Sequence, residues 1–118
     1  MPITHLIDGD LLVVRLENPT SVTLEPDFDG AILALLADSG ARWLIVDFGD
    51  VRMFQSLGIS ALIHVQRHCR QAGVAMAVCG LSSDVSNVFK ITGLNRLVRV
   101  YATEAEARSG LRPPEMAP

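Results

Sequence analysis

Residues 46–62 read VDFGDVRMFQSLGISAL, and this stretch decides the fold because it leads a buried strand through a tight loop into a helix. The apolar strand ends at Asp47, the loop contains Gly49, and helical spacing of apolar residues begins after Ser56. A serine there places a hydroxyl at a helix amino terminus, where backbone N–H groups lack partners and the helix dipole is positive. Such a place suits a phosphate on the serine, and it equally suits the unmodified serine as a helix cap.

The sequence before this stretch predicts a hairpin, a helix and a strand. Two apolar runs, residues 3–7 and 11–16, flank Asp8-Gly9-Asp10, which is typical of a tight turn between antiparallel strands. Pro26 suits a first helical turn, and Gly40 stops that helix. The apolar residues at helical spacing between them are Phe28, Ile32, Leu35 and Leu36. The continuous apolar run over residues 43–48 predicts an inner strand covered on both faces.

The helix that begins at Ser56 has one apolar and one polar face, and Gly73 ends it. The residues expected to be buried are Gly58, Ala61, Leu62, Val65 and Cys69. The residues expected on the opposite face are Ser60, His64, Arg67 and Gln71.

The rest of the chain continues the alternation of strand and helix. A strand over residues 74–79 is followed by a helix that Ser82 or Ser83 caps and Gly93 stops, then by a strand that reaches Val100. Thr103 and Glu106 form a capping box before a last short helix.

The expected element order is therefore β-β-α-β-α-β-α-β-α. Strands that alternate with helices after an opening hairpin require a mixed, mostly parallel sheet with right-handed crossovers. A chain of 118 residues can bury one core and is too short for two domains. We therefore expect a single α/β domain over residues 1–111 and a flexible tail over residues 112–118.

Composition excludes several classes of function. The net charge is −3 and Lys90 is the only lysine, which argues against a nucleic-acid-binding surface. The amino terminus lacks the features of a signal peptide, and no apolar stretch is long enough to span a membrane, so we expect a cytoplasmic protein. Cys69 and Cys79 have no CxxC spacing and suit apolar packing better than a disulfide or a metal site. No cofactor motif is present.

The pattern around Ser56 resembles the STAS domain of bacterial anti-sigma factor antagonists: an acidic strand end, Gly-x-Val, an aromatic residue, and Ser-x-Gly before an apolar helix. The similarity continues in order and spacing to Tyr101 and is weaker before Arg42. Its downstream parts are Gln71-Ala72-Gly73, the strand over residues 74–79, the turn Gly80-Leu81-Ser82-Ser83, and the run over residues 88–97. The fold that this resemblance implies agrees with the one expected from periodicity.

The resemblance implies a non-catalytic partner switch. In such proteins the unmodified form binds a serine kinase of the histidine-kinase-like ATPase fold that acts as the anti-sigma factor, phosphorylation of the serine releases it, and a PP2C-type phosphatase resets the switch. Ser56 occupies the place of the phosphorylated serine. The residues implied in partner binding are Ser21, Phe54, Gln55, Ser56, Leu57 and Ser60. Met53, Phe54 and Leu57 could form an apolar docking patch around the hydroxyl, or Phe54 and Leu57 could be core residues and Ser56 only a cap.

The sequence departs from the family pattern at two places. Family members commonly read Asp-Ser-Ser-Gly where this chain has Gln55-Ser56-Leu57-Gly58, so the acidic neighbour and the second hydroxyl are missing. The upstream Gly-Glu-Leu-Asp segment is also missing, and the expected loop aspartate falls on Ser21. Kinase recognition is therefore expected to be either altered or lost relative to other members.

Other candidate sites are weaker. His64 and His68 have the spacing of a two-histidine metal site, but a third ligand is missing and a solvated helix face is favoured. Ser56 and His64 are about 12 Å apart along a helix axis, too far for a nucleophile and its base. Asp47 and Asp50 could bind a cation or simply form a turn.

A basic surface and two rival functions remain open. Lys90, Arg96, Arg99 and Arg108 lie in the last third of the chain and could receive an acidic partner, or they could be dispersed surface charges. One rival is a STAS subunit of an ABC-type lipid transporter that binds the ATPase without phosphorylation. The other is a small-ligand sensor, which a ligand would stabilise against heat.

Overall fold

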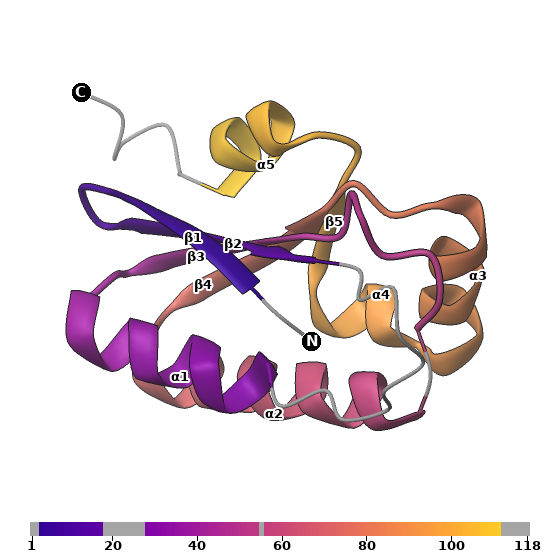
Figure 1. The fold of residues 1–118 in the computed structure, drawn as a ribbon, viewed down its shortest axis with the longest axis horizontal. Helices are drawn as coiled ribbons and strands as arrows, with labels where there is room; N and C mark the ends of the chain where they lie inside the picture. The colour runs from indigo at the N-terminus through magenta and orange to yellow at the C-terminus, as the bar shows by residue number, and fades with distance from the viewer. Residues whose placement is uncertain (1–2, 18–27, 55, 112–118) are drawn as a thin grey trace.

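The computed structural model describes residues 3–17, 28–54 and 56–111, and its five strands form one sheet in the order β1-β2-β3-β4-β5 (Figure 1). The strands are β1 (Ile3–Asp8), β2 (Leu11–Leu16), β3 (Trp43–Asp47), β4 (Ala75–Cys79) and β5 (Arg99–Tyr101). β1 pairs with β2 antiparallel, and the other neighbours pair in parallel. The predicted hairpin and the predicted mixed, mostly parallel sheet are both confirmed.

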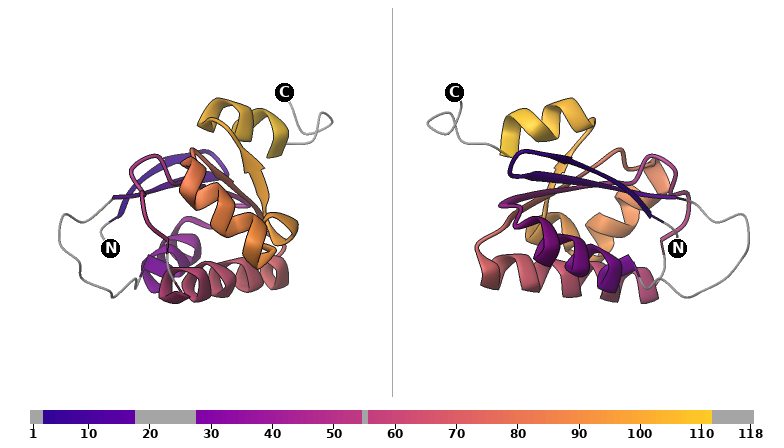
Figure 2. Two further views of the ribbon diagram at one scale, coloured as in Figure 1. Left: turned by 90° about the vertical axis from the view of Figure 1, so that its right-hand side faces the viewer. Right: turned by 60° about the vertical axis from the view of Figure 1, so that its left-hand side comes forward.

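Helices cover both faces of the sheet unequally. They are α1 (Phe28–Ser39), α2 (Ser56–Ala72), α3 (Ser83–Thr92), α4 (Leu94–Leu97) and α5 (Glu104–Leu111). From β2 to β5, each strand is added next to the previous one in the same direction across the sheet. Right-handed crossovers therefore place the helices that connect these strands on one common face. Figure 1 shows α1 and α2 under the sheet and α5 on the opposite face, and Figure 2 shows the same layers from two sides.

The sheet therefore separates two apolar clusters. The larger one joins β2, β3 and β4 to α1, α2 and α3, with Leu12, Val46 and Val78 on the strand side. The smaller one joins the other face to α5 through Ala107 and Leu111. Alternate residues of a strand point to opposite faces, so the continuous apolar run of β3 serves both clusters.

The residues that form α2 were predicted well. All five residues expected on its apolar face are buried, and Ser60, His64, Arg67 and Gln71 are exposed. Gly73 has a φ of 74°, a left-handed conformation that favours glycine and ends the helix.

Two predicted caps are also present in the structure. The Ser82 hydroxyl accepts a hydrogen bond from the Val85 N–H at 3.2 Å at the start of α3, and Gly93 ends that helix. The Thr103 hydroxyl accepts one from the Glu106 N–H at 3.1 Å at the start of α5.

The expected order of elements needs one correction, because residues 94–97 form the one-turn helix α4 instead of a plain turn. One turn is too short to show a helical period in the sequence. β3 and β4 are each one residue shorter than the strands predicted over residues 43–48 and 74–79. Pro26 and the tail over residues 112–118 lie outside the described residues.

Neither cysteine is available for redox or metal chemistry. Cys69 and Cys79 are buried free thiols in different apolar clusters, on opposite faces of the sheet. Burial raises the pKa of Cys69 to about 11 and that of Cys79 to about 12, so both stay protonated at neutral pH. The predicted packing role of both cysteines is confirmed.

Among the helices of the described residues, none has both the length and the apolar character needed to cross a membrane.

Candidate functional site

Ser56 lies on the surface at the first residue of α2, where the loop that follows β3 meets the helix. Met53 and Leu57 on either side of it are also exposed, by 70% and 58%. Ser60 is exposed one turn further along the helix. Together Met53, Ser56, Leu57 and Ser60 form what we call the Ser56 surface, which combines apolar side chains with hydroxyl groups. Ser21 and Gln55, the other two predicted contact residues, lie outside the described residues.

Phe54 does not belong to this surface: of the two roles that the sequence left open, docking patch or core, the core role is confirmed for Phe54 and is wrong for Leu57. The Phe54 ring is only 6% exposed and packs against two other phenylalanines. The ring centres of Phe54 and Phe48 are 5.2 Å apart in an edge-to-face arrangement, and those of Phe54 and Phe89 are 5.9 Å apart in a stacked one. Phe54 thereby anchors the segment that precedes Ser56 to the core between β3 and α3.

Gly58 makes this anchor possible. A Cβ atom at residue 58 would lie 2.8 Å from Cε1 of the Phe54 ring, closer than real Cβ contacts allow. The glycine of the Ser-x-Gly pattern therefore lets the aromatic ring pack directly against the first turn of α2. The sequence showed the aromatic residue and the glycine but not their contact.

The loop after β3 is held by polar contacts. The Asp47 carboxylate accepts a hydrogen bond from the Gly49 N–H at 2.8 Å. Arg15 of β2 stands opposite Asp47 of β3 in the strand register. Its Nε atom lies 3.9 Å from the Asp47 carboxylate and 3.8 Å from the Asp50 carboxylate. A guanidinium between the two carboxylates favours a structural role for both over cation binding. Sequence reasoning missed Arg15 because its contact with them depends on strand register.

His64 is turned toward α1 and not toward Ser56. Its Nδ1 atom lies 2.9 Å from the carboxylate of Asp29, which links α1 to α2. The structure does not bring Ser56 and His64 together as a nucleophile and base. Within residues 3–17, 28–54 and 56–111, no three His, Cys, Asp or Glu side chains gather as metal ligands, and His68 is simply exposed.

The link between Asp29 and His64 predicts a pH-dependent contribution to stability. The hydrogen bond from His64 lowers the pKa of Asp29, although burial opposes it. A carboxyl group whose pKa is lower in the folded than in the unfolded state stabilises the folded protein. This stabilisation is fully present above the unfolded pKa of about 3.9 and is lost as the pH falls through the folded pKa. Because the His64 side chain is 60% exposed and that of Asp29 is 26% exposed, solvent screens the pair, and we expect Asp29→Asn to lower the unfolding free energy by less than about 1 kcal/mol at pH 7.

A double-mutant cycle measures this effect. Urea unfolding of Asp29→Asn, His64→Ala and the double variant at pH 7 should give a favourable coupling energy that disappears at pH 2. Asp38→Asn at the other end of α1 is the control, since Asp38 is exposed and forms no ion pair with any described residue. An equal coupling at both pH values would contradict the assigned contact.

The basic residues of the last third do not all remain free for an acidic partner. Arg108 pairs with Asp8 at 2.9 Å and with Glu104 at 3.0 Å, and Arg99 donates to the Gly110 carbonyl at 3.4 Å. The contacts of Arg108 with Asp8 and of Arg99 with Gly110 connect α5 to the sheet, whereas the pair with Glu104 lies within α5. Lys90 and Arg96 are exposed on α3 and α4. The four cations are thus divided between two parts of the fold, as expected for dispersed charge.

Comparison with known proteins agrees with this geometry. The model of the STAS domain family matches residues 2–107 of the chain. The chain is 27% identical over 82 residues to BtrV of Bordetella bronchiseptica, whose name places it among the anti-sigma factor antagonists. That match covers 70% of this chain and 71% of BtrV.

Solved structures show the same fold. The anti-sigma factor antagonist SpoIIAA in its unphosphorylated form gives a TM-score of 0.76 at 19% identity, over 94% of this chain and 96% of that one. The phosphorylated form of SpoIIAA, a Bacillus cell fate determinant, gives 0.70 at 18% identity, over 94% and 100% of the two chains.

Proposed function

The chain belongs to the STAS domain family, and from this premise we propose that it is an anti-sigma factor antagonist switched by phosphorylation of Ser56. In the unmodified form, the Ser56 surface binds a serine kinase of the histidine-kinase-like ATPase fold that acts as the anti-sigma factor. Transfer of the γ-phosphoryl group of ATP to the Ser56 hydroxyl, with release of ADP and a proton, ends that complex. A PP2C-type phosphatase restores it by hydrolysis. The chain itself performs no catalysis and works in the cytoplasm, where ATP is available.

The observation that carries the proposal is the exposure of Ser56 at the start of α2 between two exposed apolar side chains, Met53 and Leu57. An apolar surface with a hydroxyl at its centre can be buried by a partner protein. A phosphate at the same hydroxyl adds roughly two negative charges, which the partner must then desolvate or repel. One local modification thus separates a binding form from a non-binding form.

The support beneath the surface favours such a local switch. Phe54 is packed into the core, and Asp47 is tied to Gly49 and lies close to Arg15, so the loop before Ser56 has fixed contacts that do not involve the hydroxyl. A phosphate on Ser56 therefore breaks none of these contacts. SpoIIAA has been solved in both an unphosphorylated and a phosphorylated form, which is consistent with a switch that keeps the fold.

The kinase that acts on this chain must accept an unusual sequence. Leu57 stands where the family commonly has a second hydroxyl, and its side chain is exposed and available to a kinase. We propose that the cognate kinase contacts Leu57 through an apolar pocket.

Intact-mass spectrometry tests the modification. Incubation of the protein with ATP and its cognate kinase should add one phosphoryl group that peptide mapping assigns to Ser56. Ser56→Ala should gain none, while Ser60→Ala, the matched variant one turn further along α2, should still gain one. Phosphorylation that maps to Ser60 or Ser82, or that survives in Ser56→Ala, would contradict the proposal.

A further inference from the structure

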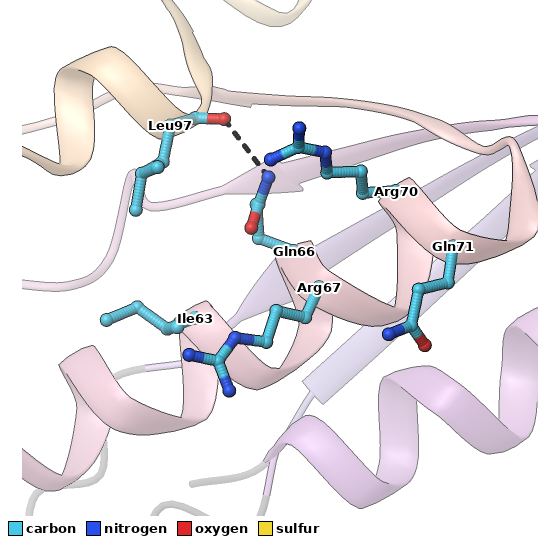
Figure 3. A pocket seen from close by; sticks show the side chains of 6 residues that line it. All are labelled: Ile63, Gln66, Arg67, Arg70, Gln71 and Leu97. Carbon is cyan, nitrogen blue, oxygen red and sulfur yellow. Dashed lines mark hydrogen bonds between the residues drawn. The ribbon is translucent and has the colours of Figure 1, made fainter.

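The second half of α2 carries a groove that the Ser56 switch does not use. It has a volume of about 570 Å³ and is lined by Ile63, Gln66, Arg67, Arg70 and Gln71 of α2 and by Leu97 of α4 (Figure 3). Ile63, Gln66 and Arg70, and likewise Ile63, Arg67 and Gln71, are spaced three or four residues apart, so the five residues form one stripe along the helix. The α4 side is joined to α2 by a hydrogen bond of 3.4 Å from the Gln66 amide to the Leu97 carbonyl.

The groove is positively charged. Arg67 and Arg70 are exposed, and neither forms an ion pair with any residue in the described parts of the chain. α2 contains no acidic residue at all over its 17 positions. This local charge stands out in a chain whose net charge is −3, where arginines elsewhere, such as Arg15 and Arg108, lie next to carboxylates.

Apolar groups lie beside the charges. Ile63 lies at one end of the stripe, and Leu97, which is 46% exposed, forms the wall on the α4 side. Figure 3 shows Gln66 and Arg70 directed toward Leu97, and Arg67 extended toward Ile63. The groove thus combines two cations with apolar lining, which suits a peptide that carries both acidic and aliphatic side chains.

We propose that this groove binds a short acidic segment of a partner protein, with carboxylates on Arg67 and Arg70 and an aliphatic side chain between Ile63 and Leu97. Guanidinium groups bind carboxylates through paired, charge-assisted hydrogen bonds, and the glutamine amides supply further donors to the segment's backbone. A nucleic acid or an anionic membrane would need a wide basic surface, and the net negative charge of the chain disfavours both.

The two arginines of the groove lie away from Ser56, although Ile63 at the near end of the groove is one turn beyond Ser60 of the Ser56 surface. Arg70 is 14 residues beyond Ser56, which corresponds to about 21 Å along the helix axis. Contacts of a peptide with the two arginines therefore do not involve the Ser56 hydroxyl, and the two proposals can fail separately.

Fluorescence anisotropy with a labelled six-residue peptide of alternating glutamate and leucine tests the groove, with a glutamine-for-glutamate peptide as the control. We expect the acidic peptide to bind and the control peptide to bind at least tenfold more weakly. Arg67→Gln/Arg70→Gln should weaken binding by at least tenfold, and Arg67→Glu/Arg70→Glu should abolish it. Lys90→Glu, which changes an exposed cation on α3, and Ser56→Asp should both leave it unchanged within twofold.

Circular dichroism and thermal unfolding establish that the arginine variants fold, as expected for exposed side chains. Amide chemical-shift changes on peptide addition should map to residues 63–71 and 94–97. Equal binding of the two peptides, binding that survives the arginine changes, or shifts confined to other elements would overturn the proposal. Arginine-dependent binding to phosphatidylglycerol vesicles without peptide binding would also overturn it and assign the groove to lipid headgroups.

Discussion

Ser56→Asp is expected to weaken binding of the cognate anti-sigma factor kinase by about 100-fold, while Ser56→Ala keeps full affinity. The added carboxylate must be desolvated or repelled in an interface built from apolar side chains, and a 100-fold loss of affinity corresponds to about 2.7 kcal/mol. Alanine removes the hydroxyl without adding charge, so Met53 and Leu57 still dock. The Ser56→Ala complex should also persist in the presence of ATP, because it cannot be phosphorylated. Isothermal titration calorimetry with the purified kinase measures both affinities.

Ser109→Asp is the matched control for this experiment. Ser109 is exposed on α5, which covers the other face of the sheet, so the same charge is added away from the proposed interface. Its affinity should equal that of the unmodified protein. If Ser56→Asp and Ser56→Ala bind the kinase equally well, the switch is wrong even though the family assignment stands.

Phe54→Ala is expected to lower the unfolding free energy by about 3 kcal/mol, whereas Met53→Ala next to it changes it by less than about 0.5 kcal/mol. The Phe54 ring is buried against Phe48 and Phe89, and its removal leaves a cavity beneath the loop that leads to Ser56. Met53 is exposed, so its side chain buries little surface in the free protein. Urea unfolding of the two variants measures the difference.

Phe54→Ala also tests whether packing supports binding. With Phe54 removed, the segment before Ser56 loses its anchor, and we expect weaker kinase binding even under conditions where the variant is folded. Equal stability of Phe54→Ala and Met53→Ala would show that the aromatic contacts do not hold this segment in place.

Much of the fold was predictable because its signals are local. The Asp-Gly turn, the apolar period of α2 and the capping hydroxyls of Ser82 and Thr103 each fall within one short segment. α4 was not predicted, since four residues contain a single helical turn. The position of α5 on the opposite face of the sheet from α1 and α2 depends on the order of the strands, which the sequence pattern does not specify.

The position and exposure of Ser56 could be predicted from the sequence, but the contacts that hold the preceding loop in place could not. Ser56 is marked by the strand-loop-helix pattern, and its exposure agrees with the expectation. The sequence left Phe54 open between an exposed patch and the core, because one aromatic residue in a loop has no period that shows its direction. Its contact with Phe89 joins segments far apart in the chain, as do those of Arg15 with Asp47 and of His64 with Asp29. Long-range pairs of this kind depend on the assembled fold.

The central claim, that a phosphate on Ser56 separates a binding form from a non-binding form, is tested most directly with the phosphorylated protein itself. Unmodified and fully Ser56-phosphorylated protein should be titrated into the same kinase preparation, with circular dichroism to compare their folds. We predict unchanged spectra and an affinity at least about 100-fold lower for the phosphorylated form. Equal affinity of the two forms would contradict the account.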